Sequence, residues 1–93
     1  MYRSAGIVAL CRAVGIPCYL SSGTDMSLGL AAMLHCYSAV PGFEPALEAF
    51  EEMSDDLAAN PVTWGPVMKV PKGPGLGIEV DEQKIAKYRK KLR

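Results

Sequence analysis

The order of apolar and polar positions predicts a helix, a strand and a second helix in the N-terminal half of the chain. Residues 5–14 carry apolar side chains at helical spacing, at Ile7, Val8, Leu10, Cys11 and Val14. Gly15 follows as the residue that accepts a left-handed conformation at a helix end. The segment Ile16–Leu20 is apolar on both faces, which is typical of a strand in a parallel sheet covered by helices. A helix rich in small residues is expected over 27–37.

The predicted turn between this strand and the second helix is the best candidate site. Three hydroxyl side chains there are candidates for substrate binding: Ser21, Ser22 and Thr24. Polar groups at the carboxyl ends of parallel strands line the active sites of many α/β enzymes. Asp25 could therefore act as a general acid or base, or bind a donor group of a substrate. The simpler interpretation is that Asp25 caps the following helix, and spacing alone slightly favours the cap.

Residues 46–50 fit either a short strand or the first turn of a helix, and 51–60 are polar and acidic. In a strand, Glu48 would point away from Leu47 and towards a site. In a helix, Glu48 would join a solvated acidic face formed by Glu51, Glu52, Asp55 and Asp56. The residues alone favour this second interpretation.

Prolines and glycines dominate the next part of the chain. They predict an irregular β-rich wrap, with extended pieces at 62–64, 67–70 and 77–80. The segment Gly73–Gly77 looks like a phosphate-binding loop, but no helix follows it directly, so a tight chain reversal is expected. Asp81 is the expected N-cap of a helix over 82–91, whose basic C-terminal end complements the helix dipole.

Size and charge restrict the class of protein. The chain has 93 residues, enough for one domain, and ten basic residues balance ten acidic ones. This balance gives no reason to expect nucleic acid or an acidic membrane as a partner. The longest apolar region, Ala5–Leu20, is interrupted by Arg12, Gly15 and Pro17 and is too broken to span a bilayer. A soluble, cytoplasmic protein is expected.

The cysteines are best interpreted as reduced core thiols. Cys11, Cys18 and Cys36 all lie in apolar segments, and none belongs to a CxxC motif. Thiol chemistry at Cys18 or Cys36 is a weaker alternative. A zinc site is disfavoured because His35 is the only histidine, and this residue is expected to pack in an apolar helix.

Two stretches together resemble one enzyme family. They are GIPCYLSSGTDMSLGLAAMLH, residues 15–35, and VPKGPGLGIEVDEQKIAKY, residues 70–88. Both resemble the C-terminal part of the enolase superfamily, in its mandelate racemase/muconate lactonizing enzyme branch, and the resemblance covers nearly the whole chain. It implies an α/β fold that is the last part of a modified TIM (β/α) barrel. Residues 1–60 would supply helix 6, strand 7, helix 7 and a degenerate strand 8. Residues 61–93 would pack on the capping domain.

The resemblance also implies a chemistry. The family uses a divalent metal, usually Mg²⁺, to stabilise the enediolate formed when a base removes the proton next to a carboxylate. The family's metal ligands and lysine bases lie on earlier strands, so Mg²⁺ is expected in a full-length relative and no cofactor in this chain. Asp25 matches a glutamate near the substrate, and Glu48 lies near the glutamate that polarises the substrate carboxylate. Gly23 stands where mandelate racemase-type members have a histidine base, which disfavours the histidine-dependent reactions.

The resulting prediction is a C-terminal barrel fragment of a racemase or epimerase, cycloisomerase or dehydratase, inactive as an isolated chain. Its small-molecule partner would contain a carboxylate. Because an edge strand without its neighbour invites pairing, the chain should associate with a complementary barrel chain or with itself. The alternative is a non-enzymatic small domain that acts as an oligomerisation or interaction module.

Overall fold

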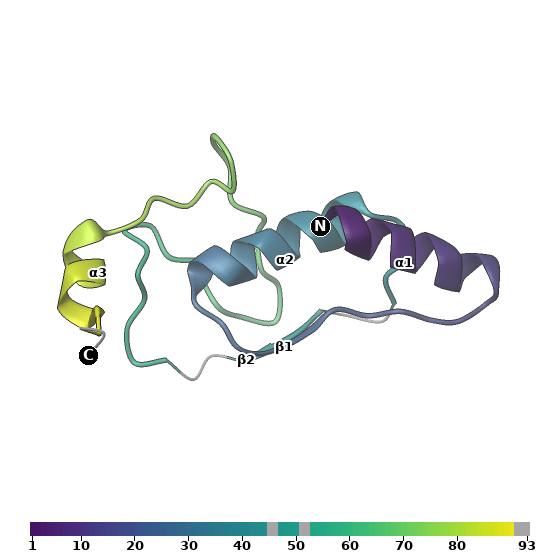
Figure 1. Cartoon of the computed structure of the whole chain (residues 1–93), viewed down its shortest axis with the longest axis horizontal. Helices are drawn as coiled ribbons and strands as arrows, with labels where there is room; N and C mark the ends of the chain where they lie inside the picture. The colour runs from purple at the N-terminus through teal and green to yellow at the C-terminus, as the bar shows by residue number, and fades with distance from the viewer. Residues whose placement is uncertain (45–46, 51–52, 91–93) are drawn as a thin grey trace.

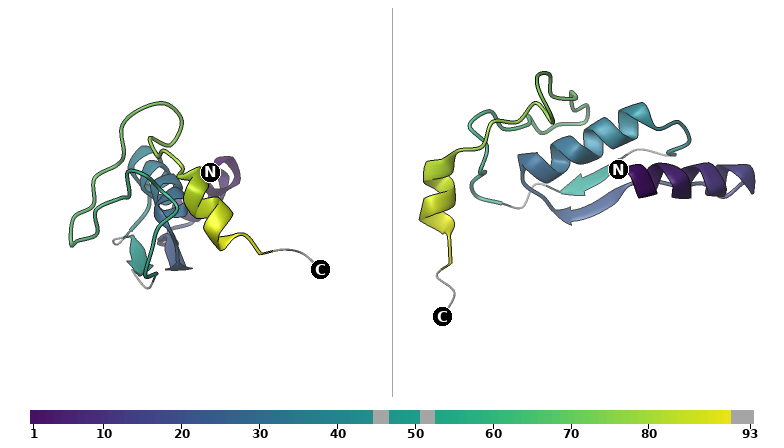
Figure 2. Two further views of the ribbon diagram at one scale, coloured as in Figure 1. Left: turned by 90° about the vertical axis from the view of Figure 1, so that its left-hand side faces the viewer. Right: turned by 45° about the horizontal axis from the view of Figure 1, so that its top comes forward.

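A computed structural model describes residues 1–44, 47–50 and 53–90 and shows an α/β chain (Figure 1). The elements follow in the order α1 (Tyr2–Ala13), β1 (Ser21–Thr24), α2 (Ser27–Ala39), β2 (Glu48–Phe50) and α3 (Glu82–Tyr88). Strands β1 and β2 are parallel, and α2 connects them, which makes a βαβ unit. Helices α1 and α2 lie on one side of the strand pair, and in the views of Figures 1 and 2 no described element covers the other side.

The first strand lies later in the chain than the prediction Ile16–Leu20. Cys18 makes only an isolated parallel bridge to Phe43, and the strand itself occupies the predicted turn. The reason is the register with β2, where Ser21 pairs with Glu48. A run of apolar residues indicates a buried extended segment, but the bounds of a strand are set by its backbone hydrogen bonds to the neighbouring strand. The prediction of a turn over 21–25 was therefore wrong.

The second strand settles the alternative left open for residues 46–50. Residues 48–50 are a strand, so the favoured assignment of Glu48 to a solvated helical face was wrong. Leu47 and Ala49 pack against the core cluster beneath α2. Because successive side chains of a strand point to opposite faces, Glu48 points to the uncovered face.

The chain reversal after α1 confirms the role predicted for Gly15. Its φ is +73°, in the left-handed region, and the Ile16 N–H donates to the Cys11 carbonyl at 2.9 Å. These are the features of a helix end closed by glycine. The reversal brings the following extended segment back beneath the helix layer.

The core is formed between α2 and the wrap that follows β2. Leu30, Ala31 and Leu34 of α2 are buried against Val62. Partly buried hydrophobic side chains from the strands and the wrap surround this cluster: Leu47, Ala49, Trp64, Met68, Val70, Leu76 and Ile78. One cluster therefore draws on residues from both sides of the predicted boundary at 60/61. The role of 61–93 on a capping domain stays a prediction.

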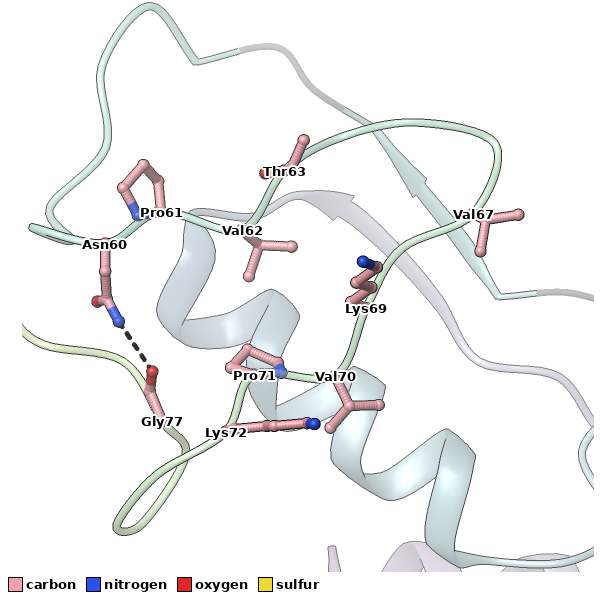
Figure 3. A pocket seen from close by; sticks show the side chains of 10 residues that line it. All are labelled: Asn60, Pro61, Val62, Thr63, Val67, Lys69, Val70, Pro71, Lys72 and Gly77. Atoms are coloured by element: carbon pink, nitrogen blue, oxygen red, sulfur yellow. Dashed lines mark hydrogen bonds between the residues drawn. The ribbon is translucent and has the colours of Figure 1, made fainter.

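The wrap is irregular, and the three extended pieces predicted in it are not strands. Among the residues that the structure describes there, Val80 alone pairs as a bridge, with Ala58. Prolines remove the N–H donors that a ladder needs. The wrap is instead held by Asn60, whose amide donates to Gly77 O at 3.0 Å (Figure 3). The Asn60 amide oxygen also accepts from Glu79 N–H at 2.7 Å.

Two predictions for the C-terminal part are confirmed. Residues 73–77 reverse the chain, with the Gly77 N–H donating to Pro74 O at 3.0 Å. Asp81 caps α3 by accepting from Gln83 N–H and Lys84 N–H. The helix ends at Tyr88, earlier than the predicted residue 91, which lies outside the described residues together with 92 and 93.

The molecule is elongated and buries little of its apolar surface. Its radius of gyration is 15.1 Å, whereas a compact domain of this length has about 12 Å. Its accessible surface is 7162 Å², against about 5,200 Å² for a folded monomer of this mass. Six large apolar side chains of α1 and the segment after it are exposed: Tyr2, Ile7, Leu10, Val14, Ile16 and Tyr19. No helix within the described ranges is long and apolar enough to cross a membrane.

Candidate functional site

Glu48 and Ser21 form the first half of the predicted site. The two residues are partners in the β1–β2 register, and Ser21 Oγ donates to Glu48 Oε2 at 2.7 Å. Both side chains are exposed on the face of the strand pair opposite the helices. The structure thus brings together two residues that the sequence predicted separately, and it orients the Glu48 carboxylate through a hydroxyl group.

Asp25 and Ser22 form the second half. The Ser22 hydroxyl donates to Asp25 Oδ2. Asp25 Oδ1 lies so close to Gly29 that a Cβ built on this glycine would be only 2.8 Å away. A glycine in the first turn of α2 therefore makes room for the carboxylate. Ser21 and Ser22 point to opposite faces of β1, so their hydroxyls hold two separate carboxylates, Glu48 on the uncovered face and Asp25 just beyond the end of the strand.

The cap of α2 is not Asp25. The N-cap residue is Met26, which makes no side-chain capping bond. The first N–H of the helix, at Ser27, donates instead to Asp56 Oδ2 at 2.8 Å, and Ser27 Oγ donates to the same oxygen at 2.6 Å. The capping interpretation of Asp25 was wrong, because a carboxylate from a distant loop fills that position.

Ser27 and Asp56 link three segments of the chain. Ser27 is completely buried, and its Oγ also accepts from Val62 N–H at 2.8 Å. Burial of Asp56 opposes its ionisation, but hydrogen bonds from Ser27 and from Ala58 N–H outweigh this effect and hold the pKa of Asp56 below its ordinary value. Sequence reasoning placed Asp56 on a solvated face because nothing in its neighbours signals this contact.

Asp55, beside it, binds α3. Its carboxylate accepts from Lys84 Nζ at 2.7 Å and from the Tyr88 hydroxyl at 2.7 Å. These two bonds hold the pKa of Asp55 far below its ordinary range, and the Asp55 bond raises the pKa of Lys84. The loop after β2 is therefore bonded to two helices, through Asp56 to α2 and through Asp55 to α3.

A hollow of about 410 Å³ lies beside Asp25. Its lining includes Thr63, Trp64 and Lys84. Carboxylate, hydroxyl and ammonium groups at its edge could accept or donate hydrogen bonds to a small polar molecule. Glu48 and Ser21 do not line this hollow.

A second hollow of about 410 Å³ lies within the wrap, between residues 60–63 and 67–72 (Figure 3). Lys69 and Lys72 give it a positive character. None of the predicted site residues lines it.

Two other residues considered in the sequence, Thr24 and His35, lie outside both halves of the site. Thr24 ends β1, pairs in register with Phe50 and is exposed. His35 is half-buried in α2, and one ring nitrogen lies 3.0 Å from Leu76 O, which suits the predicted packing role. Across residues 1–44, 47–50 and 53–90, no three His, Cys, Asp or Glu side chains are grouped so that they could hold a metal ion.

The chain is similar to enzymes that are far longer than itself. It is 33% identical over 85 residues to muconate cycloisomerase 1 from Rhodococcus opacus, covering 87% of this chain and 22% of that enzyme. It is 29% identical over 82 residues to a probable glucarate dehydratase from Streptomyces coelicolor, covering 86% of this chain and 19% of that protein. The chain therefore spans about a fifth of the length of these relatives.

A solved structure shows the same fold. An enolase from Gibberella zeae PH-1, crystallised with magnesium, formate and sulfate, superposes with a TM-score of 0.77 and 29% identity. The match covers 92% of this chain and 21% of that one. Residues 1–84 also match the family described as enolase C-terminal domain-like. The helix–strand–helix order, the parallel β1–β2 pair and these matches agree, and the chain belongs to the enolase C-terminal domain-like family.

Proposed function

We propose that this chain is one arc of an enolase-type (β/α) barrel, and that the complete enzyme removes the proton next to the carboxylate of a small-molecule substrate. The observation that carries the proposal is the Ser21–Glu48 pair on the uncovered face of β1–β2. In a closed barrel with helices outside, the face opposite the helices is turned inward. A carboxylate at that position is directed at the barrel interior.

Glu48 and Asp25 are proposed to act on the substrate in different ways. Glu48, oriented by Ser21, would bind and polarise the substrate carboxylate as negative charge moves onto it. Asp25 lies beyond the end of β1 beside a polar hollow, where it would accept a hydrogen bond from a substrate hydroxyl. Ser22 fixes the Asp25 carboxylate, and Thr24 extends the same strand end.

Magnesium would be held by other residues of the complete enzyme. The related enolase from Gibberella zeae was crystallised with magnesium. The described part of this chain does not fit a magnesium cage, because no three carboxylate, histidine or cysteine side chains converge in it. The isolated chain is therefore expected to be inactive.

Among the possible reactions, cycloisomerisation is favoured over dehydration. The chain is 33% identical to muconate cycloisomerase 1 and 29% identical to the probable glucarate dehydratase. Gly23 occupies the position at which the resemblance expects a histidine base in histidine-dependent members. A glycine supplies no base on β1, so a reaction that needs one there is disfavoured.

The exposed apolar surface supports association with the rest of a barrel. Ile7 and Leu10 of α1 form an exposed apolar stripe with Val14, the C-cap residue, while Val8 on another side is the buried residue of that helix. An apolar stripe on both sides of a helix is expected where the helix packs between two layers. The same surface would serve the alternative, in which the chain is an oligomerisation or interaction module without enzymatic activity.

A chimera tests the enzymatic proposal. This chain replaces the matching segment of muconate cycloisomerase 1, and cycloisomerisation of muconate is assayed with magnesium. We expect an active chimera in which Glu48→Gln lowers kcat/KM by about 100-fold or more, because the Glu48 carboxylate stabilises charge in the transition state. Glu79→Gln, at an exposed glutamate of the wrap, is the matched control. A folded chimera with full activity after Glu48→Gln would refute the assignment.

A further inference from the structure

The hollow within the wrap is framed by backbone that the proposed reaction does not use. Its volume is about 410 Å³, which is within the range of small-molecule sites. Figure 3 shows its two ends: the Asn60 amide bonded to Gly77 O closes one, and the bend between Thr63 and Val67 closes the other. None of the residues of the proposed active site lines it. The hollow is therefore a separate place at which a small molecule could bind.

The lining of this hollow carries positive charge and no negative charge. Ten residues line it; two of them are Lys69 and Lys72, and none is an aspartate or a glutamate. Within the described ranges, the ion pairs of lysine join Lys84 and Lys87 to Asp55, and neither Lys69 nor Lys72 takes part in one. Both of these lysines are exposed. Their two ammonium groups, each a mobile point charge on a flexible stem, therefore attract anions to the hollow.

The rest of the wall is largely apolar. Five of the ten lining residues are proline or valine: Pro61, Val62, Val67, Val70 and Pro71. Val67 is 83% exposed, so part of this apolar wall is open to a ligand. An inorganic anion gains nothing from such a surface, whereas an organic anion removes hydrocarbon from water when it binds there. The combination of charge and apolar wall therefore favours an organic anion.

We propose that the wrap hollow binds a small organic dicarboxylate, with one carboxylate on Lys69, the other on Lys72 and the hydrocarbon chain against the apolar wall. The Thr63 hydroxyl, which also lines the hollow, can donate a hydrogen bond to one carboxylate. The ligand needs both charges and the apolar chain between them. The site is separate from the Ser21–Glu48 pair, and binding there does not depend on the proposed reaction.

A matched series of ligands separates charge from apolar contact. Pimelate has a carboxylate at each end of an apolar chain, heptanoate has one, heptanediol has the chain without charge, and sulfate, used as a competitor, has the charge without the chain. The organic ligands are titrated into the full chain at constant ionic strength, because salt screens exposed charges. Binding is followed by saturation-transfer NMR of the ligand, which also reports on an associated chain.

Saturable binding of pimelate is expected. Its affinity should be about threefold higher than that of heptanoate and about tenfold higher than that of heptanediol, because each exposed ion pair makes a modest contribution. Three results would overturn the proposal: no saturable binding of pimelate, equal affinities for pimelate and heptanediol, or complete displacement of pimelate by an equal concentration of sulfate.

Three lysine variants locate the site. Lys69→Gln and Lys72→Gln should each weaken pimelate binding about threefold and abolish the preference for pimelate over heptanoate, because one of the two charges is lost. Both side chains are exposed, so the circular dichroism spectrum should stay unchanged. Lys90→Gln removes the same charge from an exposed lysine that does not line the hollow, and it should leave the affinity unchanged. An equal loss in Lys90→Gln, or no loss in Lys69→Gln and Lys72→Gln, would contradict this location.

Discussion

At the scale of single residues, the Ser27–Asp56 contact shows how a site residue can be misassigned. Asp25 and Asp56 are both acidic residues near a helix start, and local spacing favoured Asp25 as the cap. Asp56 reaches Ser27 across 29 positions of sequence. No local pattern encodes such a contact, because it depends on where the loop after β2 returns. Asp25 does not cap α2, which is compatible with its proposed role beside the polar hollow.

Replacing Ser27 with alanine should destabilise the chain by about 1–3 kcal/mol, because a buried donor and an acceptor lose their partner. The Val62 N–H would be left without the hydroxyl at 2.8 Å. The free energy of unfolding is measured from the helical circular dichroism signal in urea. Ser38→Ala is the control on the same helix, since the exposed Ser38 Oγ donates only to the His35 carbonyl at 3.1 Å. An equal effect of both substitutions would contradict the structural role of Ser27.

The lowered pKa of Asp56 predicts a pH dependence. Its folded-state pKa lies below its unfolded-state pKa, so the ionised carboxylate stabilises the fold above about pH 4. This contribution is lost as the pH falls through the folded-state pKa. Wild type and Asp56→Asn are compared in urea between about pH 2 and pH 6. The stability gap should close on acidification, and a gap that stays constant over this range would disprove the linkage.

At the scale of elements, helices were easier to predict than strands. Gly15 and Asp81 marked a helix end and a helix start that the structure confirms. The strand Ile16–Leu20 was displaced because pairing with Glu48, not apolar character, sets the position of β1. The opposite faces of Glu48 and Leu47 could be predicted once a strand was assumed, but the choice between strand and helix required the partner strand.

The glycine-rich reversal is predicted to be essential for the wrap. Gly77 has a φ of +71°, and a Cβ there would lie 2.9 Å from Lys72 O and from Pro71 C. Gly77→Ala should cost about 1–3 kcal/mol, because both the backbone strain and the clash must be relieved. Gly65→Ala, where the nearest atom is 3.8 Å away, should change the melting temperature little. A similar melting temperature for both variants would show that the reversal is not under this constraint.

At the scale of the whole molecule, burial is the feature that sequence periodicity could not reveal. Ile7 and Leu10 of α1 were correctly predicted as helical, yet Ile7 is 60% exposed and Leu10 is 68% exposed. The sequence shows that a residue is apolar, but whether its side chain is buried depends on which other segments pack against it. The large radius of gyration and the uncovered face of β1–β2 are both expected of the proposed barrel arc.

Light scattering of the purified 93-residue chain, with amide exchange on the same sample, tests whether the chain behaves as an incomplete barrel arc. We predict a mass above the 10.0 kDa of one chain, because the exposed apolar stripe drives association. Leu10→Lys should shift the mass towards one chain, while Lys72→Ala, in the exposed wrap, should not. A 10.0 kDa monomer with slowly exchanging β1 and β2 amides would contradict the account.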